Sequence, residues 1–272
     1  MAMYQDFYGL KEAPFNVTSD PNFLYLSRHH QEAYSHLAYG IQERKGFLQI
    51  TGEIGTGKTT LCRALLNRLD QKVKTAFILN PNLSPVQLLQ AIVGDFGLSS
   101  KHRTRMDLIK SLNQFLMEQA NQGGNVVLII DEAQNSSPEA LEQIRLLSNL
   151  ETEKEKLFQI VLVGQPELRN KLEDPSLRQL KQRIGVRYHI SPLEVDDVTG
   201  YIHHRLNVAG SDGKILFPRR SIDLIYRYSK GVPRLINTVC DKALLAGYVY
   251  ETFQIGPEIV KRCIQELEKP NG

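Results

Sequence analysis

Five strongly apolar runs alternate with segments of helical periodicity, and this alternation is the feature that most constrains the fold. Each run is almost continuously hydrophobic and is bounded by polar turns, as expected of a parallel strand that is buried on both faces. The predicted strands cover residues 47–51, 73–79, 126–130, 157–163 and 186–190. The predicted helices of this part cover residues 58–69, 85–96, 106–120, 138–149 and 175–183. The pattern predicts an α/β fold with a five-stranded parallel sheet sandwiched by helices.

The strand pattern stops after Ser191-Pro192-Leu193. Prolines and glycines then mark the boundaries of four predicted helices, at about residues 194–208, 219–229, 233–248 and 257–268. We therefore expect an α/β core over residues 1–192 and a small all-helical lid domain over residues 193–272. The length of 272 residues suits one sizeable core with a smaller appendage.

The segment GEIGTGKTT joins the first predicted strand to a helix and matches the pattern G-x-x-x-x-G-K-[ST]. Its glycines let backbone N–H groups turn towards phosphate oxygens, and the helix N-terminus adds a partial positive charge. Lys58 would reach the β- and γ-phosphates, and the Thr59 hydroxyl would bind Mg²⁺. A tight turn with an accidental Lys-Thr is the alternative, and the flanking strand and helix argue against it. The predicted ATP/ADP-binding residues of this loop are Gly52, Glu53, Ile54, Gly55, Thr56, Gly57, Lys58, Thr59 and Thr60.

Two further predicted strands end in polar residues. In NVVLIIDEAQ, Asp131 is predicted to act on Mg²⁺ through its water shell, and Glu132 to orient and polarise the attacking water. In IVLVGQPEL, Gln165 is predicted to contact the γ-phosphate or the lytic water. A solvated turn at Asp131-Glu132 and a turn cap at Gln165 are the simpler alternatives.

Taken together, these residues are similar to AAA+ ATPases and, more closely, resemble the ATPase domain of the ExeA/GspA type from the general (type II) secretion pathway. The resemblance is carried by GEIGTGKTTLCRALL, LIIDEAQNSSPEALEQIRLLSNLE, VLVGQPEL, LRQLKQRIGVRYHISPL and GVPRLINTVCDKALLAGY, and by residues 8–41 at the N-terminal end. It implies ATP hydrolysis completed across subunit interfaces in a homo-oligomer, a ring or a nucleotide-dependent filament. It also implies a partner protein in secretion or envelope assembly. Transposition regulators of the TnsC, TniB and MuB kind are related, so an ATP-dependent regulator that binds duplex DNA is the alternative.

The resemblance also gives roles to residues outside the loop. Arg183 would be an arginine finger that reaches the γ-phosphate of the neighbouring subunit, with Arg178 as second choice. Arg234, in GVPRL, resembles the sensor 2 arginine that couples the γ-phosphate to the lid. The alternatives are a basic helix surface for Arg183 and Arg178, and a structural arginine at a helix N-terminus for Arg234.

The N-terminal segment, residues 1–40, resembles the region that closes over adenine in this family. Tyr25 and Leu26 are the best candidates for adenine contacts, and core packing is the alternative for both.

Composition adds weaker limits. The net charge of +3 is mild, and three widely spaced cysteines suit a reducing compartment. No apolar stretch is long enough to span a bilayer and no signal peptide opens the chain, so we expect a cytoplasmic protein, or the cytoplasmic domain of a longer membrane-anchored one. The densest basic cluster, KHRTR at residues 101–105, could contact nucleic-acid phosphates or form a solvated loop.

Overall fold

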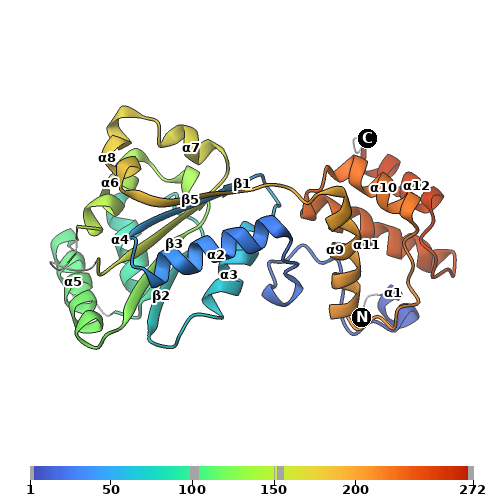
Figure 1. Ribbon diagram of the computed structural model, residues 1–272, viewed down its shortest axis with the longest axis horizontal. Coiled ribbons are helices and arrows are strands. Elements are labelled where there is room, and N and C mark those ends of the chain that lie inside the picture. The colour runs from blue at the N-terminus through green and yellow to red at the C-terminus, as the bar shows by residue number, and fades with distance from the viewer. Residues whose placement is uncertain (1–2, 99–103, 150, 152–155, 269–272) are drawn as a thin grey trace. The chain divides into compact units, whose positions relative to one another are not determined.

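The computed structural model describes residues 3–98, 104–149, 151 and 156–268 (Figure 1). The chain divides into two compact units, each with its own hydrophobic core. The sheet unit comprises His29–Gly52 and Leu61–Ile190. The helical unit comprises Met1–Arg28, Glu53–Thr60 and Ser191–Gly272.

The sheet unit is built on five parallel strands in the order β2-β3-β4-β1-β5. The strands are β1 (Phe47–Gly52), β2 (Val73–Ile78), β3 (Asn125–Ile130), β4 (Gln159–Gly164) and β5 (Ile184–Ile190). β1, β3 and β4 have almost no exposed residues, which explains their continuous hydrophobicity. The predicted α/β fold with a five-stranded parallel sheet is confirmed.

Helices cover both faces of this sheet. They are α2 (Arg28–Gln42), α3 (Lys58–Leu66), α4 (Pro85–Asp95), α5 (Arg105–Asn121), α6 (Pro138–Leu147), α7 (Glu167–Lys171) and α8 (Arg178–Arg183). α4, α5, α6 and α8 share one core with alternate residues of the strands, such as Leu128 and Ile160. On the other face, α2 approaches closely at Gly40, where an added Cβ would lie 2.1 Å from a Leu48 methyl carbon.

The sequence analysis did not predict α2, although Ala33, Leu37 and Ile41 are all buried at helical spacing. Histidines, glutamine and tyrosines at the intervening positions weaken the periodicity in the sequence. Packing against the sheet, rather than local propensity, stabilises such a helix.

The helical unit contains α1 (Met3–Tyr8), α9 (Val195–Val208), α10 (Arg219–Ser229), α11 (Pro233–Val249) and α12 (Pro257–Glu268). Its core combines apolar residues of these helices with Leu10, Phe15 and Phe23 from the N-terminal end. The Lys11 N–H donates to the Ala209 carbonyl at 2.8 Å, and the Tyr8 hydroxyl contacts the carbonyls of Leu244 and Thr252. The structure thus groups the residues up to Arg28 with the C-terminal helices, whereas the sequence analysis placed them with the α/β core.

Within the described ranges, no helix is both long enough and apolar enough to span a bilayer.

Candidate functional site

The carboxyl ends of three neighbouring strands bring the predicted polar residues to one edge of the sheet. Ile130 of β3 pairs with Leu162 of β4, and Gly164 of β4 pairs with Thr51 of β1. Asp131 directly follows β3, Gln165 directly follows β4, and Gly52 is the last residue of β1. Their place at the carboxyl edge is where ligands bind in open α/β sheets.

Asp131 and Glu132 occupy different environments although they are adjacent. Asp131 is 2% exposed, and its main-chain N–H donates to the Ile78 carbonyl at the end of β2, at 2.8 Å. Its Oδ1 accepts the Glu132 N–H at 2.9 Å. Glu132 is half-buried and has the left-handed backbone φ of 51° and ψ of 37°, which is uncommon for a residue other than glycine. The chain therefore turns sharply directly after β3.

The Glu132 carboxylate is held by two side-chain amides. Gln165 Nε2 donates to Glu132 Oε2 at 3.0 Å, and Gln134 Nε2 donates to the same oxygen. The side-chain oxygen of Gln134, Oε1, in turn accepts the main-chain N–H of Gln165 at 3.1 Å. The structure therefore brings the two predicted site residues Glu132 and Gln165 together, and it adds Gln134. The sequence analysis quoted Gln134 within DEAQ but gave it no role, because nothing local to the chain shows that its side chain turns back to the tip of β4.

Residues Glu53–Thr60 of the segment GEIGTGKTT belong to the helical unit and form hydrogen bonds with one another. Lys58 Nζ donates to the Glu53 carbonyl at 2.9 Å, and the Thr56 hydroxyl donates to the same carbonyl at 2.9 Å. Lys58 is 5% exposed and Thr56 is fully buried. Lys58 also begins α3, so the loop leads directly into a helix N-terminus. A buried ammonium bound to a loop carbonyl at a helix N-terminus fits a phosphate-binding loop.

Gly55 brings this loop against the N-terminus of α11. Its φ is +82°, and an added Cβ would lie 2.6 Å from Cβ of Arg234 and 3.3 Å from a Val232 methyl carbon. The Arg234 N–H donates to the Gly55 carbonyl at 3.3 Å. Arg234, predicted as a sensor residue, therefore contacts the predicted phosphate loop through its backbone, and only glycine allows the close approach.

The two candidate adenine contacts also lie in the helical unit. The Tyr25 hydroxyl packs against the backbone of α9, where a Cβ added to Gly200 would lie 2.6 Å from it. The Tyr25 ring meets Tyr201 edge-on, with centroids 6.0 Å apart, and lies 5.8 Å from the His204 ring. Burial, followed by the charge of Asp197, raises the pKa of Tyr25. Leu26 is half-buried. Both residues keep their predicted role in adenine binding as a hypothesis.

The predicted finger arginine lies at the end of α8 and contacts the residue that follows α6. Arg183 is the last residue of α8, and its Nη1 donates to the Ser148 hydroxyl at 2.8 Å. The Ser148 hydroxyl donates to the Arg145 carbonyl at 2.7 Å. Arg145 itself is committed to Glu142 through a two-pronged ion pair, which lowers the pKa of the Glu142 carboxyl. Arg178, the second choice, begins α8.

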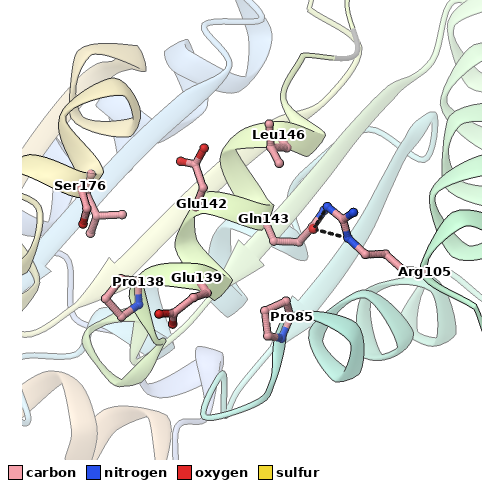
Figure 2. Close-up of a pocket in the computed structure, with 9 residues that line it drawn as sticks. Pro85, Arg105, Pro138, Glu139, Glu142, Gln143, Leu146 and Ser176 are labelled. Carbon is pink, nitrogen blue, oxygen red and sulfur yellow. Dashed lines mark hydrogen bonds between the residues drawn. The ribbon is translucent and has the colours of Figure 1, made fainter.

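A surface concavity of about 650 Å³ lies beside α6. Figure 2 shows the Arg105 guanidinium directed at the Gln143 amide on one side of it, with donor–acceptor distances of 2.9 and 2.6 Å. Glu139 and Glu142 also line it, and the Ser137 hydroxyl lowers the pKa of the Glu139 carboxyl. None of the predicted nucleotide-binding residues lines this concavity. Residues 101–103 of the basic cluster KHRTR lie outside the described residues, and Arg105 is engaged with Gln143.

Residues that could hold a divalent cation are present without forming a dedicated cluster. Across the described ranges, no group of three or more His, Cys, Asp or Glu side chains could hold a metal ion. Thr59, near the start of α3, carries a hydroxyl, and Asp131, directly after β3, carries a carboxylate. Oxygen donors of both kinds are ones that Mg²⁺ takes together with substrate phosphates, so each residue by itself suits the role predicted for it.

Comparison with known proteins agrees with this geometry. A profile of the AAA domain matches residues 41–172. General secretion pathway protein A from Aeromonas hydrophila is 45% identical over 254 residues, which cover 93% of this chain. This chain is similar to AAA domains over residues 41–172. The predicted resemblance to the ExeA/GspA type is confirmed, and the chain spans 46% of the length of that relative.

Solved structures confirm the AAA+ fold at low sequence identity. The ORC2 protein of Aeropyrum pernix, in ADPNP and ADP complexes, has a TM-score of 0.72 and 17% identity, covering 96% of this chain and 73% of that one. Drosophila ORC bound to DNA has a TM-score of 0.73 and 17% identity, covering 99% and 67%. At these identities the comparison shows the fold of the AAA+ chain and nothing further about its ligands.

Proposed function

We propose that this AAA+ chain is an Mg²⁺-dependent ATPase that converts ATP and water to ADP and phosphate. The observation that supports this most is the cluster of the buried Asp131 and the half-buried Glu132 and Gln165 at the carboxyl edge of the sheet, in a chain whose first strand leads into the proposed phosphate loop. Among the described residues, Glu132 Oε1 accepts no hydrogen bond. This oxygen can therefore accept one from the attacking water.

Each residue in the proposed site has a distinct task. The loop N–H groups and Lys58 bind the phosphates, and Thr59 and Asp131 would hold the cation. Mg²⁺, when bound, neutralises charge on the phosphate oxygens. Glu132 orients and deprotonates the water. Gln165 contacts the attacking water or the γ-phosphate. Arg234 couples the presence of the γ-phosphate to the position of the lid helices.

Hydrolysis in this proposal is completed by Arg183 of a neighbouring copy. Among the described residues, the Arg183 guanidinium donates to the neutral Ser148 hydroxyl, whereas the nearby Arg145 forms the ion pair with Glu142. In this proposal the Arg183 guanidinium serves a phosphate of another subunit, and arginine fingers contribute about 10³–10⁵ in rate.

A mixing experiment tests both the chemistry and its division between subunits. Arg183→Ala keeps its own site but lacks the finger, and Glu132→Gln keeps the finger but lacks the water-orienting carboxylate. Each variant alone should release phosphate slowly. An equal mixture should recover about a quarter of wild-type turnover, because half of the sites are intact and half of these face an intact finger. No recovery, together with full activity of Arg183→Ala, would show that the finger assignment is wrong.

For the biological output we propose assembly or secretion at the cell envelope, carried out by a homo-oligomer on the cytoplasmic side with a dedicated partner protein. The support is the 45% identity to General secretion pathway protein A, of which this chain spans less than half. A duplex-DNA-binding regulator is the second candidate, and the similar fold of Drosophila ORC bound to DNA is what favours it. A gel-shift titration with duplex DNA separates them. ATP-dependent binding that weakens steeply with salt would favour the second candidate, and no binding with or without ATP would favour the first.

A further inference from the structure

We propose that Gln134 is a positioning residue that fixes the Glu132 carboxylate for catalysis, and that Gly164 is a glycine because it makes room for the Gln134 side chain. This inference rests on the proposed ATPase function. It assigns a role to the fourth residue of DEAQ and to the last residue of β4.

The first argument is the shared acceptor. The amides of Gln134 and Gln165 both donate to Glu132 Oε2, one from the turn after β3 and one from the tip of β4. A glutamate side chain with three free torsions would otherwise sample many orientations. Two donors on one oxygen fix the carboxylate plane and leave Oε1 as the oxygen that can meet water.

The second argument is that Gln134 is itself held from both ends. The Gln134 side-chain oxygen, Oε1, accepts the Gln165 N–H at 3.1 Å. The main-chain carbonyl of Gln134 accepts a hydrogen bond from Lys171 Nζ. A backbone N–H can only donate, so the oxygen of the Gln134 amide must face β4 and its nitrogen must face Glu132. The direction of the hydrogen bond to the Glu132 carboxylate is thus set by the main-chain N–H of Gln165, directly after β4.

The third argument is the space at Gly164. A Cβ added there would lie 2.7 Å from Gln134 Oε1, and 3.0 Å from Leu168 Cδ2. Leu168 is fully buried and cannot move aside, so the glutamine would have to leave. The φ of Gly164 is not in the left-handed region, so alanine is accessible to the backbone and acts here through its methyl group alone.

The experiment uses the full chain and measures kcat and KM for phosphate release, nucleotide affinity and melting temperature. Gln134→Ala and Gly164→Ala should each lower kcat about 10- to 100-fold, the scale expected when a catalytic group is misplaced, with KM and nucleotide affinity unchanged. The matched control is Gln90→Ala, an exposed glutamine of α4, which should keep wild-type kcat.

A double-mutant cycle decides whether Gln134 acts through Glu132. In single-turnover assays, Gln134→Ala should have no further effect in a Glu132→Gln background, because the carboxylate that it positions is gone. The inference is overturned if Gln134→Ala keeps wild-type kcat, or if it lowers the rate equally in both backgrounds. If wild-type protein releases no phosphate at all, the proposed function fails and this inference fails with it. If Glu132→Gln is impaired while Gln134→Ala is not, the inference alone fails.

Discussion

Replacing Arg205 by alanine should release the N-terminal segment from the helical unit. Arg205 is 6% exposed on α9, and its guanidinium donates to the main-chain carbonyls of Pro14 and Asn16 and to the Tyr201 hydroxyl. The guanidinium carbon also lies 4.7 Å from the centre of the Phe23 ring. One side chain of α9 therefore binds three points of the N-terminal segment.

The magnitude follows from the groups that Arg205→Ala leaves behind. Two main-chain carbonyls lose a charged donor, at about 1–3 kcal/mol each when they stay unsatisfied. Loss of the cation–π contact adds about 0.5–2 kcal/mol. Water can enter and form some of the hydrogen bonds that the two carbonyls lose. We therefore expect the free energy of unfolding of the helical unit to fall by about 3–5 kcal/mol. At about 2–4 °C per kcal/mol, the melting temperature should drop by at least about 6 °C.

The chain has no tryptophan, so tyrosine near-ultraviolet circular dichroism is the suitable probe, with limited proteolysis to locate the released segment. Arg205→Lys keeps the charge but not the forked donors and should lie between wild type and Arg205→Ala. Arg220→Ala, at an exposed arginine of α10, is the matched control and should change stability by less than about 0.5 kcal/mol. The reasoning would be refuted if Arg205→Ala had the same melting temperature as the Arg220→Ala control and its N-terminal end resisted protease equally well.

Further predictions concern other sites. Gly55→Val should weaken binding of a fluorescent ATP analogue about tenfold or more, because the new side chain meets Arg234; Gly97→Ala, at a positive φ with open space around it, should leave affinity unchanged. Burial and a neighbouring arginine lower the pKa of His204, so its contribution to stability is complete above about pH 6.5 and is lost as the pH falls through the folded pKa. Between pH 7.5 and 5.5 the melting temperature of wild type should therefore fall more than that of His204→Phe, and equal slopes would contradict this. Phe158→Ala, in the core of the sheet unit, should lower the free energy of urea unfolding by about 3–5 kcal/mol, and a loss below 1 kcal/mol would be inconsistent with its burial.

Most elements of the fold could be predicted from local pattern. The strand around Val126–Ile130 was visible because burial on both faces requires an unbroken apolar run. α10 and α12 were visible because proline and glycine mark their ends. α2 and α1 were missed because their stability comes from contacts with distant parts of the chain. The same is true of the attachment of the N-terminal segment. No sequence pattern near Pro14 indicates that Arg205 of α9 donates a hydrogen bond to the Pro14 carbonyl.

In the candidate site, the sequence by itself determined which groups are chemically available. The predicted phosphate loop is contiguous in the chain, so its glycines, Lys58 and Thr59 could be proposed from spacing alone. Asp131 and Glu132 could be placed at a strand end for the same reason. Only the tertiary structure decided how the Glu132 carboxylate is held. The hydrogen bond from Gln165 spans 33 positions in the chain and exists because β3 pairs with β4 in one particular register. Local sequence fixes what each residue can donate or accept, whereas strand order and register decide which partner it meets.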